Sequence, residues 1–343
     1  VHTSNSVIFK VKDMRQSYYL FSNGKLQRKD NSLSLIKEDG TKADIPVERV
    51  YDIYSFGELD YNASLFSFLG SKGISVHMFN YYDFYIGSFC PKETYISGKL
   101  LVKQAEHYLD PHKRLVIAKE FILAAMDNIY RNLRYYNGRG KNVDEQMNYI
   151  EYIKGEVPKA TTVEELMGFE GMARQKYYTA FNTIINQDID FKKRVRNPPD
   201  NLINTMISYC NSLLYTKILS EIYKTQLNPT ISYLHQPGTK RFSLSLDISE
   251  IFKPLIVDRM IFSMLNKNQI TQDDFDSEIG YLRIKEKGIR KIVEEFEKRL
   301  KKTLVHKTLN RTVSYQHLIR LEAYKLIKHL TGEKEYKGFR IWW

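Results

Sequence analysis

The chain has 343 residues, of which 43% are hydrophobic, so it is long and apolar enough for two folded domains and is not a disordered protein. Its formal net charge is +12, and this excess of cations favours a polyanionic partner such as nucleic acid. The two cysteines, Cys90 and Cys210, have no CxxC spacing, which argues against a zinc site or a disulfide framework. No apolar run is long enough to span a membrane and the first residues do not resemble a signal peptide, so we expect a soluble cytoplasmic protein without a membrane partner.

Residues 1–92 are predicted to form a small domain of strands. The dipeptides Asn23-Gly24 and Asp39-Gly40 lie between alternating segments, which is typical of two-residue hairpin turns. An aromatic-rich strand at residues 81–89 favours a core or a self-association surface over a ligand site. The sequence therefore predicts a β-sandwich-like N-terminal domain.

After residue 97 the apolar residues recur at three- and four-residue spacing, which indicates helices. The predicted helices cover residues 98–107, 111–136, 142–154, 164–185, 200–226, 249–267, 273–276, 285–304 and 314–331. The fold class that follows is α+β, with the small β domain preceding a larger all-α domain over residues 98–343.

The segment 233–254 carries the most informative pattern in the chain. His235 opens a Pro-Gly loop, Asp247 is expected at the end of a short alternating strand, and Glu250 follows where a helix should begin. Because carboxylates three residues apart share one face of a helix, Asp247 and Glu250 can point to one place. A neutral imidazole facing them would complete a nitrogen and oxygen site suited to Mn2+ or Mg2+. The alternative is a turn, a strand and a capped helix with surface acids.

Glu170 lies between Gly168 and Gly171 in a predicted helix. The two glycines leave one face of this helix without side chains, so that a ligand or a neighbouring backbone can come close. One interpretation makes Glu170 a metal ligand and Arg174, one turn later, a phosphate contact or a partner of the ligand. The other interpretation is tight helix packing with an ordinary surface ion pair.

Two further groups of cations are candidates for contacts with DNA phosphates, in addition to Arg174. Arg194 and Arg196 belong to a basic cluster that ends at the start of a helix, where anions are favoured. Lys240 and Arg241 follow His235 in its loop and are expected to neutralise phosphates beside a metal. For the cluster with Arg194 and Arg196, the alternative is a solvated loop.

Motifs that resemble one known family are spread over almost the whole chain. They are Tyr19-Leu-Phe-Ser-Asn-Gly24, Ile45-Pro46, Phe56-Gly57, Arg114-Leu-Val-Ile-Ala-Lys119, residues 166–171, Pro198-Pro199, residues 233–254, residues 317–327 and the ending Tyr336 to Trp342-Trp343. Together they resemble the Cas1 family, the CRISPR-associated integrases and endonucleases of spacer acquisition, and are most similar to its bacterial type I branch.

This resemblance implies a divalent metal, Mn2+ or Mg2+, bound through Glu170, His235 and Glu250. It assigns Asp247 to a second acid beside the metal, as a supporting or alternative ligand. One residue departs from the family pattern: many relatives carry an aspartate after the double proline, where this chain has Asn201.

The resemblance also implies the activity and the partners. In integration the 3′-hydroxyl of a spacer precursor attacks a phosphodiester of the repeat array, and in DNA cleavage water attacks instead. The implied partners are DNA, a second copy of the chain bound through the β domain, and the second CRISPR-associated protein of the adaptation complex. Two alternatives stay open, namely a DNA-binding architectural subunit with a vestigial metal site and a metal phosphoesterase acting on RNA or small nucleotides.

Overall fold

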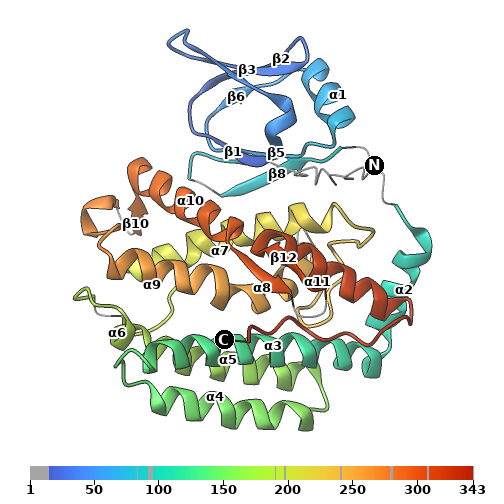
Figure 1. Cartoon of the computed structure of the whole chain (residues 1–343), viewed down its shortest axis with the longest axis vertical. Coiled ribbons are helices and arrows are strands. Elements are labelled where there is room, and N and C mark those ends of the chain that lie inside the picture. Colours follow the sequence, from blue (N-terminus) through green and yellow to red (C-terminus); the bar gives the residue numbers. More distant parts are fainter. Residues whose placement is uncertain are drawn as a thin grey trace, which may run out of the picture. The chain divides into compact units, whose positions relative to one another are not determined.

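The computed structural model describes residues 15–82, 84–91, 96–189, 191–196, 198–239, 242–278, 281–306 and 309–342 (Figure 1). The chain divides into two compact units, with the boundary between residues 94 and 95. Strands in sheets form the first unit and helices dominate the second, so the predicted order of β and α structure is confirmed. Within the described ranges, no helix is both long and apolar enough to cross a bilayer.

The N-terminal unit contains two four-stranded sheets that share one hydrophobic core. The first sheet has the order β1-β5-β7-β8, with β8 antiparallel to β7 and the other pairs parallel, and the second has the order β4-β3-β2-β6. Buried side chains from both sheets and from helix α1, including Leu26, Ile53 and Leu69, form this core. The elements are β1 (Gln16–Leu20), β2 (Gly24–Lys29), β3 (Ser32–Lys37), β4 (Lys42–Ile45), η1 (Val47–Arg49), β5 (Val50–Ser55), β6 (Leu59–Asp60), α1 (Ala63–Lys72), β7 (Val76–Phe79) and β8 (Tyr85–Phe89).

One of the two predicted hairpin turns is correct. Asp39-Gly40 connects β3 and β4, which pair antiparallel, and Gly40 has a φ of 79°. The prediction at Asn23-Gly24 is wrong, because β1 belongs to the other sheet and β2 pairs with β3 through a turn at Asp30, whose φ is 52°. Glycine is needed at position 24 because a Cβ there would lie 2.1 Å from the carbonyl oxygen of Ile36.

The C-terminal unit is mostly helical, with α3 at its centre. This helix contacts α4, α5 and α8, and Figure 1 shows it running between the α4 and α5 layer and the helices of the second half of the unit. The helical elements are α2 (Gly98–Leu109), α3 (Pro111–Asn137), α4 (Asp144–Glu156), η2 (Val157–Lys159), α5 (Val163–Thr179), α6 (Phe181–Ile184), α7 (Leu202–Ile222), α8 (Ser243–Phe252), the π-helix η3 (Lys253–Asp258), α9 (Arg259–Asn266), η4 (Gln272–Asp274), α10 (Glu286–Lys301) and α11 (Tyr315–Leu330).

Two short antiparallel hairpins correct the prediction of an all-α unit. They are β9 (Phe275–Glu278) with β10 (Tyr281–Ile284), and β11 (Thr303–His306) with β12 (Arg311–Ser314). Each strand has four residues, which is too short for alternation to stand out against the helical periodicity on both sides. The unit is therefore mostly helical and not purely so.

Residues 243–246 form the first turn of α8, whereas the sequence predicted a strand there. Leu244, Ile248 and Ile251 follow helical spacing and are buried, and Ser243 and Ser245 between them are buried as well. The alternation of leucine and serine therefore belongs to a helix that is enclosed on all sides. As a result Asp247 and Glu250 both lie within one helix.

Candidate active site

Glu250 lies at the end of α8, directly before the π-helix η3. Pro254 has no backbone N–H and therefore interrupts the α-helical hydrogen-bond pattern at this point. Asn128 of α3 donates to the carbonyl of Ile251 at 3.0 Å, and Asn132 donates to the carbonyl of Pro254 at 2.6 Å. These two buried amides satisfy carbonyls at the junction, so α3 fixes the end of α8. Short π-helical turns of this kind are frequent at functional sites.

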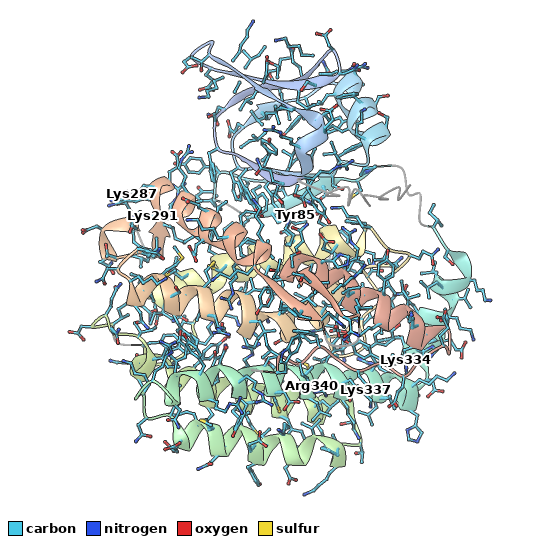
Figure 2. All side chains as sticks on the ribbon, in the orientation of Figure 1. Tyr85, Lys287, Lys291, Lys334, Lys337 and Arg340 are labelled. Atoms are coloured by element: carbon cyan, nitrogen blue, oxygen red, sulfur yellow. The ribbon has the colours of Figure 1, made fainter. Side chains whose placement is uncertain are left out.

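The C-terminal segment braces the same junction. Asn128 also donates to the carbonyl of Phe339 at 3.0 Å and accepts from the backbone N–H of Ile341 at 2.9 Å. Arg340, labelled in Figure 2, pairs with Glu120 at 3.1 Å and with Asp127 at 2.7 Å, both on α3. One amide thus ties α3, α8 and the chain end together around Glu250.

Asp247 holds the His235 loop against α8. Its Oδ2 accepts from the backbone N–H groups of Tyr233 at 2.6 Å and Leu234 at 3.0 Å. Its Oδ1 accepts from the backbone N–H of His235 at 2.9 Å and lies 2.8 Å from the Nδ1 of the same residue. Both oxygens of this fully buried carboxylate are therefore committed to the loop. Asp247 thus supports the imidazole of His235, whereas Glu250 contacts Arg174 and Lys253.

His235 is oriented for ligand binding by this contact. A neutral imidazole donates from Nδ1 to Asp247, which leaves Nε2 as the nitrogen that can bind a ligand. Burial lowers the pKa of His235, but the hydrogen bond to Asp247 and the negative charges of Asp247 and Glu250 raise it above its ordinary value.

Arg174 of α5 joins the two glutamates that the sequence singled out. Its Nη2 lies 3.0 Å from Oε2 of Glu250, and its Nε lies 3.5 Å from Oε1 of Glu170. Its Nη1 lies 3.5 Å from Oδ2 of Asp258. With only 7% of its surface exposed, this guanidinium serves three carboxylates and does not face solvent as the predicted phosphate contact would. Lys253 adds a second cation, since its ammonium contacts Oε1 of Glu250.

Glu170, His235 and Glu250 share one electrostatic environment. Burial raises the pKa of Glu170, and the negative charge of Glu250 raises it further. Burial opposes ionisation of Glu250 as well, but Lys253, Arg174 and His235 hold its pKa at about 2. The charges of Glu250 and His235 both act on Glu170, and Glu250 and His235 act on each other, although α5, the 235 loop and α8 are far apart in the sequence. In the structure Arg174 of α5 contacts both glutamates, and Asp247 of α8 holds the imidazole of His235.

The carboxylates of Glu170 and Glu250 nevertheless contact cationic side chains of the protein itself. Among the residues that the structure describes, no group of three or more His, Cys, Asp or Glu side chains stands close enough together to hold a metal ion. The reason is visible at Glu250, whose two oxygens contact Arg174 and Lys253.

The glycines beside Glu170 face open space. A Cβ at Gly168 or at Gly171 would meet no atom within 4 Å, so tight helix packing does not explain them. Both glycines are exposed, whereas Glu170 between them is half-buried.

The other predicted DNA contacts fall into three situations. Arg194 is half-buried and donates to the carbonyl of Asn204 at 3.2 Å and to Oγ of Ser208 at 2.8 Å, so it fastens its own loop to α7. Arg196 is exposed. Lys240 and Arg241 lie outside the described residues. Of these cations, Arg196 is the one whose described position fits a phosphate contact.

Asn201, the residue that departs from the family pattern, caps α7. Its side chain accepts from the backbone N–H of Asn204 at 2.9 Å. Asparagine and aspartate are about equally good in this position, so the departure leaves the helix start intact.

Sequence reasoning missed Lys253 and Asp258. Lys253 follows Glu250 by three residues, and this spacing on one helix was a usable signal. Asp258 had no such signal, because it is separated from Arg174 by 84 residues and their contact is visible only in the folded chain. Burial raises the pKa of Asp258 to about 6 despite the nearby charges of Arg174 and Lys253.

Comparisons with known proteins show the family to which this chain belongs. The family profile described as CRISPR associated protein Cas1 matches residues 18–298. The CRISPR-associated endonuclease Cas1 of Fusobacterium nucleatum subsp. nucleatum is 59% identical over 331 residues, which is 96% of this chain and 98% of that protein. The CRISPR-associated endonuclease Cas1 3 of Thermodesulfovibrio yellowstonii is 47% identical over 96% of this chain and all of its own length. A solved Cas1 protein from Thermotoga maritima has a TM-score of 0.84 at 40% identity, covering 95% of this chain and 100% of that one. The chain therefore belongs to the CRISPR-associated protein Cas1 family.

Proposed function

We propose that this protein is a metal-dependent DNA endonuclease and integrase of CRISPR spacer acquisition. Relatives that match it over nearly their whole length are named CRISPR-associated endonucleases. The observation that carries the proposal is the pairing of Glu170 and Glu250 through Arg174, beside an imidazole that Asp247 orients.

The donor set fits Mn2+ or Mg2+ in kind. Two carboxylates and one imidazole nitrogen are oxygen and nitrogen ligands, and a nitrogen ligand favours Mn2+ over Mg2+. The pKa of Glu170 is raised by burial and by the charge of Glu250, which means that the pair gains from a further cation nearby. In the described residues Lys253 supplies positive charge to Glu250, and a divalent ion would compete with this ammonium. When bound, such an ion polarises a phosphodiester and stabilises the charge that develops on it.

The residues of the chain have separate tasks in this reaction. Asp247 holds the Nδ1 of His235 and so leaves its Nε2 free of this contact, while Arg174 and Lys253 keep Glu250 ionised despite its burial. In integration the 3′-oxygen of the spacer precursor forms a bond to phosphorus and its proton is lost to solvent. The bond from phosphorus to the 3′-oxygen of the repeat strand breaks, and this departing oxygen takes up a proton from solvent to become a 3′-hydroxyl. Water takes the place of the attacking hydroxyl in cleavage.

Substrate class is the first test of this function. With Mn2+ we expect cleavage of DNA to exceed cleavage of RNA of the same sequence, and both to stop when the metal is chelated. The assay is a side-by-side gel analysis of end-labelled strands. A preference for RNA would support the phosphoesterase alternative in place of spacer acquisition.

Metal affinity is expected to depend on the protonation of His235. Its pKa is raised by Asp247 and Glu250 against the effect of burial, and a protonated imidazole cannot bind a metal. The affinity for Mn2+ should therefore fall by about tenfold per pH unit below this pKa, since one proton is displaced. Because the pKa is raised, the fall should begin at a higher pH than for a free imidazole, for which the pKa is about 6.5. Titration calorimetry between pH 5.5 and 8.5, roughly one to two units either side of that value, measures this. An affinity that is independent of pH over this range would remove His235 from the ligand set.

The partners are proposed to include DNA, a second CRISPR-associated protein and a second copy of this chain. The β7–β8 connection and the start of β8 carry exposed apolar side chains, which supports self-association through the N-terminal unit. They are Tyr81, Tyr82, Phe84 and Ile86.

Replacing Phe84 and Ile86 together with serine is expected to convert a dimer into a monomer, because two exposed apolar side chains leave the interface. Light scattering after gel filtration gives the mass. Tyr152→Ser is a matched control, since Tyr152 is equally exposed but lies on α4 in the other unit. A dimer that persists in the double variant would show that another surface is used.

A further inference from the structure

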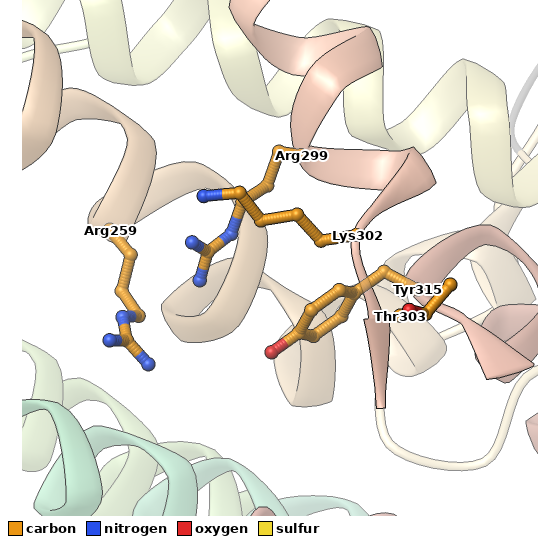
Figure 3. A pocket seen from close by; sticks show the side chains of 5 residues that line it. All are labelled: Arg259, Arg299, Lys302, Thr303 and Tyr315. Carbon is orange, nitrogen blue, oxygen red and sulfur yellow. The ribbon is translucent and has the colours of Figure 1, made fainter. Parts of the chain in front are cut away.

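A pocket with a volume of about 220 Å³ lies at the C-terminal end of α10 (Figure 3). Its lining residues are different from Arg174 and from the carboxylates that Arg174 contacts. Arg259 begins α9, Arg299 and Lys302 come from the end of α10, Thr303 begins β11 and Tyr315 begins α11. Figure 3 shows the ends of Arg299 and Lys302 and the hydroxyl of Tyr315 facing a common space, with Arg259 across it.

Three cations line this pocket and no acid does. Burial lowers the pKa of Arg299, and the charge of Arg259 lowers it further. Burial also lowers the pKa of Lys302, and both arginines add to the effect. The negative charge of Glu295 raises the pKa of both Arg299 and Lys302, but Glu295 does not line the pocket. An anion in the pocket would relieve this repulsion between like charges.

The guanidinium groups are held in fixed positions. Arg299 donates from Nε and Nη2 to the carbonyl of Leu255 in η3, at 2.9 and 2.6 Å, and its guanidinium lies 5.3 Å from the centre of the Tyr315 ring. Arg259 lies over the ring of Tyr135 at 4.7 Å. A planar donor group that is already oriented loses little freedom when it binds an oxyanion. The pocket is thus organised for binding before a ligand arrives.

We propose that this pocket binds a phosphate group. Its volume is below the range of pockets for drug-sized ligands, which favours a small anion over a whole nucleotide. Two arginines, one lysine and two hydroxyl groups are the donors that phosphate oxygens accept from. The phosphate comes either from the backbone of DNA, a source that rests on the proposed function, or from a free phosphate ion.

The test uses Arg259→Gln and Lys302→Gln, which remove one cation each. Arg299 is left in place because it also holds the backbone of Leu255. Lys298→Gln is the matched control: it removes the same charge from an exposed position of α10, where Lys298 pairs with Glu294 at 2.7 Å outside the pocket.

The first arm measures thermal stabilisation of the full chain by inorganic phosphate, against chloride at equal ionic strength. Wild type and Lys298→Gln are expected to gain melting temperature, and both pocket variants to lose most of that gain. The second arm measures binding of duplex DNA in the presence of a metal chelator over a range of salt concentrations. Loss of one phosphate contact makes the negative slope of log K against log salt less steep by about 0.9, whereas the control keeps the slope of wild type.

A difference in the first arm supports a free phosphate ion, and a difference in the second supports a backbone phosphate. Pocket variants that match Lys298→Gln in both arms overturn the proposal. Neither arm contains a divalent metal, so both measure binding independently of the proposed catalysis. A protein that binds as expected in these arms but does not cleave DNA when Mn2+ is added would count against the catalytic assignment and not against this pocket.

Discussion

Separate replacement of His235 and of Glu170 by alanine is expected to lower the rates of DNA cleavage and strand transfer by more than about 100-fold. Loss of a residue that merely supports a metal ligand costs about 10–100-fold, and loss of a ligand itself should cost more. The expectation rests on the closeness of both side chains to Glu250, whose negative charge raises the pKa of Glu170 and of His235. Cleavage of labelled duplex and joining of a spacer precursor to a repeat-containing plasmid give the two rates.

His112→Ala is the matched control for the histidine, because the side chain of His112 is exposed at the start of α3. It should leave both rates unchanged. Circular dichroism of each variant separates lost chemistry from lost folding. Strand transfer near the wild-type rate in both site variants would point to an architectural subunit in place of an enzyme.

Arg174→Met is expected to lower the free energy of unfolding by about 3–5 kcal/mol. Removing one partner of a buried ion pair leaves an uncompensated charge, and costs of this size are typical. Here Glu250 and Asp258, both buried, lose the same partner. The loss should be smaller at pH 5 than at pH 8, because Asp258, whose pKa is raised by burial to about 6, is then protonated and neutral. Urea unfolding at the two pH values, roughly one unit below and two above that pKa, measures both effects.

Arg196→Met is the control for this experiment, since Arg196 is exposed. Substitutions at such positions usually change stability by less than about 0.5 kcal/mol. An Arg174→Met protein that unfolds like wild type but binds DNA more weakly would restore the phosphate contact that the sequence predicted.

Much of the fold was predictable because its signals are local. Asp39-Gly40 marks a real hairpin, and the long helices follow from apolar spacing. The error at Asn23-Gly24 arose because a turn signal does not say which sheet the next strand joins. The error at residues 243–246 arose because a helix buried on every side has no polar face to reveal its period.

The candidate site was predictable in its residues but not in its contacts. Residue type and family resemblance selected Glu170, His235 and Glu250; in the structure Arg174 contacts the two glutamates, and Asp247 holds His235. The task of Asp247 was hidden, because it depends on three consecutive N–H groups of a loop turning toward one carboxylate. The burial of Arg174 was hidden as well, since its partner Asp258 lies 84 residues away in the sequence.

The most direct measurement of the central claim is a crystal structure of the protein soaked with Mn2+, with the metal located by its anomalous scattering. The account predicts one peak bound by carboxylate oxygens of Glu170 and Glu250 and by the Nε2 of His235, at about 2.0–2.3 Å. It also predicts that the ammonium of Lys253 has moved away from Glu250. A saturating soak that leaves this position without a peak, or that binds Mn2+ without these three side chains, would contradict it.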